Sequence, residues 1–190
     1  MPQPVDARLR PATQADAARM LDWRNQPQVA RWMYSDHLIT PQEHARFMAT
    51  ALTDPARRYW IVELDGAPVG LAGLVDISAQ NRKATLVHYL ADPATRGRGL
   101  GAFVEVWLLD QTFRELGLNK LCCEVMFENE RAWRMHEGFG FTREAFYRAH
   151  VWKAGRPCDV VGLAILADEW AALRPASVER LRARGFAIGD

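Results

Sequence analysis

A run of alternating glycines between an apolar segment and a helix-like segment is the feature that most constrains this chain. Residues 85–91 are apolar enough for a strand, and residues 102–116 carry apolar side chains at helical spacing. The glycines are Gly97, Gly99 and Gly101. Glycine lets a backbone approach a phosphate closely, and the first N–H groups of a helix lack an internal partner. With Arg96 and Arg98 adding positive charge, the loop is predicted to hold a pyrophosphate.

Two other interpretations of this loop stay open. Gly97-x-Gly99-x-x-Ala102 also satisfies the loose dinucleotide fingerprint, and Glu124 lies at a suitable distance for a ribose contact. The glycines, however, come after roughly half of the chain, and no repeated strand–helix half follows them. The glycines could also form only a tight turn.

Length and composition limit the class of protein. A chain of 190 residues with 49% hydrophobic content predicts one folded core. The 24 Lys and Arg nearly balance the 23 Asp and Glu, which argues against nucleic acid or an anionic membrane as the main partner. With no long apolar run, the protein is expected to be cytoplasmic. The three cysteines and five histidines show neither disulfide nor metal-ligand spacing, so no metal is expected.

The remaining pattern predicts an α/β fold. We expect a main domain over residues 1–174 and a helical tail over 175–190 that breaks at Pro175, with the tail's arginines on a solvated face. Exposed strands near the C-terminus hint at a homodimer. The predicted strands are residues 5–10, 59–64, 69–75, 84–91, 120–126, 141–152 and 157–165. The predicted helices are residues 13–25, 40 onward, 102–116, 129–138 and 170–185.

Two motifs together resemble the GCN5-related N-acetyltransferases. Arg96-x-x-Gly99-x-Gly101 resembles the acyl-CoA motif of that family. Asn129-x-x-Ala132-x-x-x-His136 followed by Gly140-Phe141 resembles its second motif, with a histidine where tyrosine is usual. The resemblance covers residues 9–170 and implies a mixed, mostly antiparallel sheet of six to seven strands that splays between the fourth and fifth.

The resemblance also implies a site for acetyl-CoA as co-substrate. The backbone of Leu90 and Ala91 would pair with the pantetheine arm, and Asn129 would bond nearby. Residues 96–101 would bind the pyrophosphate, through Arg96, Gly97, Arg98, Gly99, Leu100 and Gly101.

A narrower resemblance concerns the substrate. The chain is similar to the acetyltransferases of pseudaminic acid biosynthesis in residues 21–29, 32–34, 37–44, 116–121, 150–153 and 159–160. Those enzymes acetylate the 4-amino group of UDP-4-amino-4,6-dideoxy-N-acetyl-β-L-altrosamine, on the route to flagellin glycosylation. The resemblance places Met33, Tyr34 and Phe47 in the nucleotide-sugar pocket. We expect Tyr89 to join them, with His88 in reserve, because neighbouring residues of a strand alternate and only one of the two can face the cleft. Arg24 and Arg31 are candidate phosphate partners.

The reaction requires a neutral amine to attack a thioester. Glu124 is the candidate for binding or deprotonating the amine, although it could be only a surface carboxylate. His136 is the candidate acid for the departing thiolate, and a coenzyme contact or a packing role are its alternatives. Competing functions are a protein N-terminal or polyamine acetyltransferase, for which an open acidic pocket is expected, and a catalytically idle acetyl-CoA-binding module.

Overall fold

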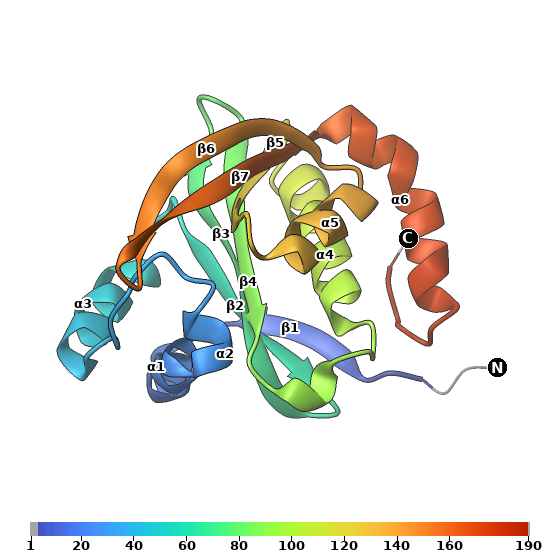
Figure 1. Ribbon diagram of the computed structural model, residues 1–190. Helices are drawn as coiled ribbons and strands as arrows, with labels where there is room; N and C mark the ends of the chain where they lie inside the picture. Colours follow the sequence, from blue (N-terminus) through green and yellow to red (C-terminus); the bar gives the residue numbers. More distant parts are fainter. Residues whose placement is uncertain (1–3, 190) are drawn as a thin grey trace.

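The computed structural model describes residues 4–189, and these contain one mixed sheet of seven strands in the order β1-β2-β3-β4-β5-β7-β6 (Figure 1). Every neighbouring pair is antiparallel except β4 and β5, which are parallel. The strands are β1 Ala7–Pro11, β2 Arg58–Leu64, β3 Ala67–Ser78, β4 Lys83–Leu90, β5 Lys120–Met126, β6 Thr142–Lys153 and β7 Arg156–Leu166. The predicted fold class is confirmed.

The parallel pair is short, and this opens the sheet. Only Lys83–Lys120, Ala84–Leu121 and Thr85–Cys122 are paired across β4 and β5. Beyond them both strands continue to their ends while β4 stays paired with β3 and β5 stays paired with β7. The sheet therefore splays between its fourth and fifth strands, as the family resemblance implies.

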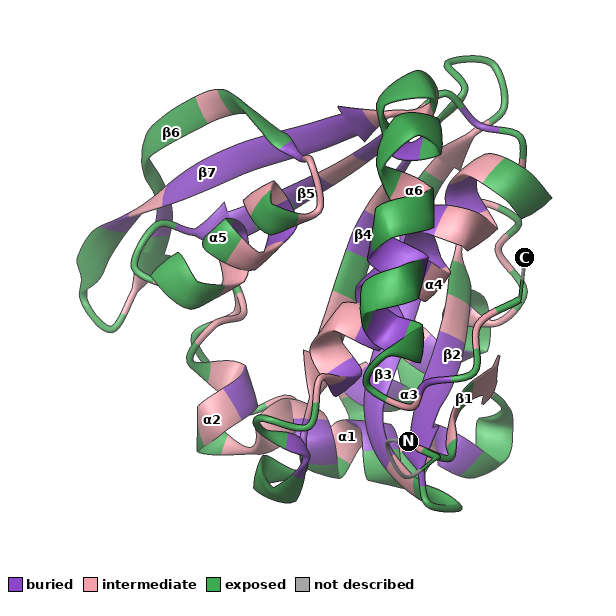
Figure 2. Ribbon diagram, turned by 90° about the vertical axis from the view of Figure 1, so that its right-hand side faces the viewer, coloured by how far each residue is buried: buried purple, intermediate pink, exposed green. Residues whose placement is uncertain are grey.

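Helices cover both faces of the sheet. The larger core lies under α4, α5 and α6, while a second cluster lies under α1 and α3 on the opposite face (Figure 1). The strands are buried between these layers, and β6 is largely exposed at the edge (Figure 2). The helices are α1 Ala17–Asn25, α2 Pro27–Ala30, α3 Pro41–Ala51, α4 Leu100–Asp110, α5 Glu130–Gly138 and α6 Ala167–Arg182. Short η1 Gln14–Asp16 and η2 Pro93–Thr95 are 3-10 turns, and α4 continues into one π-helical turn, η3 Gln111–Glu115.

Local sequence signals explain several of these boundaries. The side chain of Thr40 accepts a hydrogen bond from the N–H of Glu43, whose carboxylate accepts one from the N–H of Thr40. This capping box fixes the start of α3 as predicted. Asp65–Gly66 and Ala154–Gly155 adopt positive φ in the two hairpin turns. The single turn α2 was not predicted.

The break predicted at Pro175 is wrong, because α6 runs through that residue. Pro175 and Ala171 both lie on the exposed face of the helix, where water can satisfy a carbonyl that loses its N–H partner to a proline. Trp170, Val178 and Leu181 hold the opposite face of the helix in the core. The domain boundary predicted after residue 174 falls inside this helix.

The arginines of the tail are also not a uniformly solvated face. Arg174 is mostly buried and donates to both carboxylate oxygens of Asp110, from Nε at 2.8 and 3.1 Å and from Nη2 at 2.9 Å. The indole N–H of Trp170 donates to the same carboxylate at 3.0 Å. The tail is therefore tied to α4. Among residues 4–189, no helix combines the length and apolar character that crossing a membrane requires.

Candidate active site

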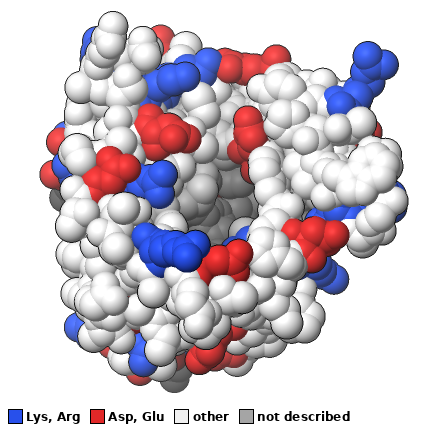
Figure 3. Space-filling view, turned by 90° about the vertical axis from the view of Figure 1, so that its left-hand side faces the viewer, with Lys and Arg blue, Asp and Glu red and all other residues white. Residues whose placement is uncertain are grey.

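A cavity of about 450 Å³ opens where β4 and β5 part. Most of its wall is apolar or aromatic, and Figure 3 shows a hollow with both acidic and basic side chains around it. Met20, Trp32, Met33, Phe47, Leu71 and Tyr89 belong to the apolar wall. The polar lining residues are Arg24, Glu43, His44, His88, Glu124, Asn129 and His136. The structure thus brings Arg24, Met33, Phe47, Tyr89, Glu124, Asn129 and His136 together from the predicted set.

The expectation that only one of His88 and Tyr89 can face the cleft is wrong. Their side chains do point to opposite faces of β4, since successive residues of a strand alternate. However, the cavity passes through the gap in the sheet, so it reaches both faces and both residues line it. Burial, rather than charge, is the main cause that raises the pKa of the Tyr89 phenol above its ordinary value.

The backbone of β4 presents alternate groups to the gap. The N–H of Ala91 donates to the carbonyl of Val69 at 2.8 Å, so it is directed at β3 and already engaged. By the same alternation the N–H and carbonyl of His88 and Leu90 are directed toward β5, where the pairing has ended. The N–H of Ala91 is therefore not free to pair with the pantetheine arm, and the predicted contact through the backbone of Leu90 stays a prediction.

The glycine loop forms the start of α4, with Gly99 as the N-cap at φ +84°. Within residues 4–189 no group accepts a hydrogen bond from the N–H of Gly97, Gly99, Leu100 or Gly101. Arg184 lies against the loop, because a Cβ on Gly99 would meet its guanidinium carbon at 3.0 Å. The loop keeps free donors and gains a cation that the sequence did not predict.

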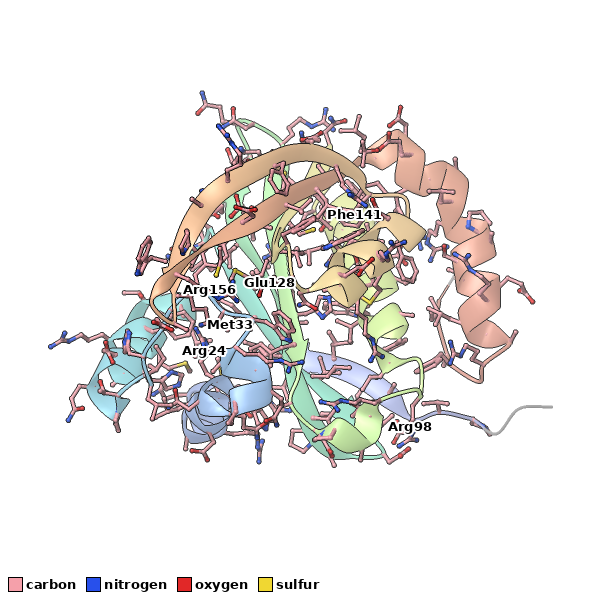
Figure 4. The ribbon with its side chains drawn as sticks, viewed as in Figure 1. Arg24, Met33, Arg98, Glu128, Phe141 and Arg156 are labelled. Carbon is pink, nitrogen blue, oxygen red and sulfur yellow. The ribbon has the colours of Figure 1, made fainter. Side chains whose placement is uncertain are left out.

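Two of the predicted arginines have other neighbours. Arg98 pairs with Asp65 at 2.9 Å, and it lies well apart from Arg24 and Met33 in Figure 4. Arg31 is exposed and stacks over the Trp32 ring, 4.5 Å from its centroid. Arg31 does not line the cavity, whereas Trp32 does.

A buried polar cluster lies beside the cavity. Nδ1 of His136 is 2.7 Å from Oε1 of Glu105, and Nε2 of His88 is 3.3 Å from Oε2 of the same carboxylate. Cys123, on β5, also interacts with the His136 imidazole and contributes to raising its pKa. These residues come from α5, α4, β4 and β5, so only the folded chain assembles them.

The charges of this cluster are coupled. Burial by itself lowers the pKa of His136, but the Glu105 carboxylate outweighs it and raises that pKa well above the ordinary value. Burial by itself raises the pKa of Glu105, and the two imidazoles bring it below the ordinary value. The raised pKa of His136 and the lowered pKa of Glu105 both indicate an imidazolium paired with a carboxylate. Burial raises the pKa of Cys123, which keeps it a thiol.

Glu124 lies on β5 at the mouth of the cavity and is held by Tyr34. The phenol of Tyr34 donates to Oε2 of Glu124 at 2.7 Å. Tyr34 belongs to the segment between α2 and α3, residues 31–40, which we call the α2–α3 loop. The ammonium of Lys153 donates to the carbonyls of Ala30, Met33 and Ser35 at 3.1, 2.9 and 2.8 Å, and so fixes this loop to the β6–β7 hairpin.

Comparison with known proteins decides the family. The model of the acetyltransferase (GNAT) domain matches residues 7–142. The chain belongs to this family. It is therefore an acetyltransferase, and the enzymes of this family take the acetyl group from acetyl-CoA.

The individual relatives share between 23% and 28% of their residues with this chain. A spermidine N(1)-acetyltransferase of Escherichia coli is 28% identical over 144 residues, covering 76% of this chain and 77% of the relative. The acetyltransferase PseH of Campylobacter jejuni is 27% identical over 120 residues, covering 63% and 73%. A Vibrio cholerae spermidine N-acetyltransferase, solved in complex with CoA and spermine, superposes with a TM-score of 0.81 at 23% identity, covering 87% of this chain and 98% of that one.

Glu105 and Lys153 were missed from the sequence. Glu105 is the one charged residue in the apolar run 103–109, and a carboxylate at such a position signals a buried partner. Lys153 carried no comparable signal, because its three acceptors are backbone carbonyls far away in the sequence.

Proposed function

We propose that this acetyltransferase acetylates the amino group of a nucleotide-activated amino sugar, of the UDP-4-amino-4,6-dideoxy-N-acetyl type used in pseudaminic acid biosynthesis. The observation that supports this most is the environment of Arg24. Its guanidinium is half-buried in the cavity wall and donates to the hydroxyl of Ser35. Among the residues that the structure describes, no carboxylate lies within ion-pair distance of it.

A cation in this position favours an anionic substrate. Burial is the main cause that lowers the pKa of Arg24, which means that the charge is poorly solvated. A guanidinium binds phosphate oxygens in a forked geometry, and a diphosphate would supply the missing counter-charge. Met33, Phe47 and Tyr89 give the flat apolar surface that a uracil ring needs.

The reaction that we propose uses groups on both sides of the gap. The N–H groups of the glycine loop would hold the coenzyme's pyrophosphate, and the free N–H of Leu90 would face the thioester. Glu124 would bind the amine or receive its proton, with Tyr34 fixing the carboxylate. His136 would protonate the departing thiolate.

A polyamine is the second candidate substrate. It is supported by the spermidine acetyltransferases among the relatives, and by the two carboxylates in the cavity wall, Glu43 and Glu124. A polycation would have to approach Arg24, however, so like-charge repulsion opposes it.

The test is a substrate panel with acetyl-CoA, followed by release of free thiol. The panel contains the UDP-4-amino sugar, spermidine and an N-terminal peptide. We expect turnover with the sugar. The Arg24→Gln variant should lose about 100-fold in kcat/KM, because a hydrogen bond to a charged group contributes roughly 2–3 kcal/mol. Arg46→Gln, which removes an exposed arginine of α3, is the matched control and should have no effect.

Each of the other possible results of the panel would support one of the alternative functions. Turnover with spermidine alone, unaffected or improved by Arg24→Gln, would replace the sugar by a polyamine. Turnover with the peptide alone would also reject the sugar. Uptake of CoA in calorimetry without turnover of any amine would indicate an idle binding module.

A further inference from the structure

We propose that Glu105 and His88 are positioning residues that hold His136 as the proton donor to the coenzyme's departing thiolate. This inference rests on the proposed reaction but not on the choice of amine. The usual tyrosine of the motif is neutral at physiological pH and needs no counter-ion. The histidine at this position needs one, and α4 provides it.

Burying the Glu105 carboxylate costs free energy unless other groups compensate its charge. Its side chain is fully buried, within the apolar run 103–109 of α4. An unpaired carboxylate in such surroundings would lose most of its solvation, at a cost comparable to the stability of many domains. Its partners are the two imidazoles, at 2.7 Å from His136 and 3.3 Å from His88.

The contacts also fix the orientation of the His136 ring. Nδ1 is directed at Glu105, so the proton on the other ring nitrogen, Nε2, is the one available for transfer. His88 packs edge-on against the ring with centroids 5.9 Å apart, and Phe141 packs from another side at 5.3 Å. His136 itself lines the cavity. The ring therefore has one orientation, with a defined proton.

Three titratable groups face His136 from the elements packed around it. They are Glu105 from α4, His88 from β4 and Cys123 from β5. Only the carboxylate is negative at neutral pH, since burial keeps Cys123 a thiol. Sulfur is a weak acceptor, so the Cys123 contact does not compete with a thiolate for the proton.

The proposed step balances in protons and bonds. The amine nitrogen forms a bond to the acetyl carbon, and the resulting tetrahedral oxyanion collapses with cleavage of the C–S bond. The thiolate that leaves takes the proton from Nε2 of His136, while the amine's proton goes to Glu124 or water. His136 is then neutral beside Glu105 and regains a proton from solvent through the cavity.

The substitution Glu105→Gln tests the role while keeping the shape of the side chain. Without the carboxylate, burial still lowers the pKa of the imidazole, so that pKa should lie no higher than its ordinary value of about 6.5. The ratio of wild-type to variant kcat should then grow with pH and reach at least about 30-fold at pH 8, because the protonated fraction of the variant's imidazole falls tenfold per pH unit. The ratio cancels the ionisation of the amine. The KM for acetyl-CoA should stay unchanged.

Two further measurements distinguish loss of the proton donor from a folding defect of the variant. The tautomer and pKa of His136 can be followed in the wild-type protein by ¹⁵N-imidazole NMR, with the signal assigned by its loss in His136→Gln. Adding His136→Tyr to Glu105→Gln should restore a flat pH ratio, because tyrosine needs no counter-ion. Glu128→Gln, which breaks the exposed pair with Arg156 at 2.7 Å, is the matched control.

The proposal is overturned if His136 in the wild-type protein titrates near 6.5, or if Glu105→Gln lowers kcat by the same factor at every pH. The kcat ratio can be measured with whichever amine the enzyme accepts, and the NMR titration needs no substrate. Failure of the nucleotide sugar as substrate would therefore leave this test intact.

Discussion

Replacing Lys153 by methionine should loosen the α2–α3 loop without disturbing the coenzyme site. The ammonium has three donors, and all three are used on the carbonyls of Ala30, Met33 and Ser35. Methionine keeps the unbranched apolar body of the side chain and removes every donor. The same loop carries Met33 and Trp32 into the cavity wall and Tyr34 onto Glu124.

The expected size follows from these contacts. A hydrogen bond to a charged group contributes about 1.5–3 kcal/mol, but the three carbonyls share one ammonium and recover water when the loop opens. We therefore take about 2 kcal/mol for the set, which shifts the balance between closed and open loop by about 30-fold. The KM for the amine should rise by up to that factor.

Steady-state kinetics at saturating acetyl-CoA measure the effect. The KM for acetyl-CoA should stay within about twofold, because the hydrogen bonds of the Lys153 ammonium go to Ala30, Met33 and Ser35 and not to the glycine loop. Lys120→Met is the matched control, since Lys120 pairs with Glu144 on the surface at 2.6 Å. An unchanged KM for the amine in Lys153→Met would refute the idea that this lysine orders the α2–α3 loop for substrate binding.

Two further variants test other parts of the molecule. Gly99→Ala places a side chain at φ +84°, which costs about 1–2 kcal/mol, so calorimetry should show that the variant binds CoA about tenfold more weakly. The control Gly155→Ala, at φ +73° in the turn between β6 and β7, should bind CoA as the wild type does. If Gly99→Ala also binds CoA as the wild type does, the proposed role of the glycine loop is contradicted. Asp16→Asn removes a buried carboxylate whose pKa lies well below its usual range because of hydrogen bonds from Arg10, so urea unfolding at pH 7 should show a loss of about 2 kcal/mol. Since the folded-state pKa is depressed, this loss should be complete above about pH 4 and shrink as the pH falls further; a deficit that does not change between pH 7 and pH 3 would count against the ion pair.

Much of the fold could be predicted because its signals are local. The capping box at Thr40 and the Asp65–Gly66 turn each depend on residues a few positions apart, and both were confirmed. Pro175 misled the prediction because the cost of a proline depends on where its missing bond lies. On an exposed face, water satisfies the carbonyl, and no local pattern shows which face that is.

The site was predictable where the motifs are contiguous and less so where distant segments meet. The glycine loop and His136 come from such motifs, and the structure places both as expected relative to β4 and α5. The partner of His136, by contrast, lies 31 residues away on another helix. The mutual exclusion of His88 and Tyr89 failed because strand alternation assumes a continuous sheet, and here the sheet is open.

The opening between β4 and β5 leaves part of β4 without a paired neighbour, as at the edge of a sheet, although β4 lies in the middle of this one. The amides of His88 and Leu90 sit between two covered strands, where hydrogen exchange is ordinarily among the slowest in a protein, yet no neighbouring strand protects them. Deuterium should therefore enter the centre of this sheet as quickly as it enters a border strand. A bound molecule that extends along β4 would slow it, so the exchange of two amides can report occupancy without any catalytic turnover.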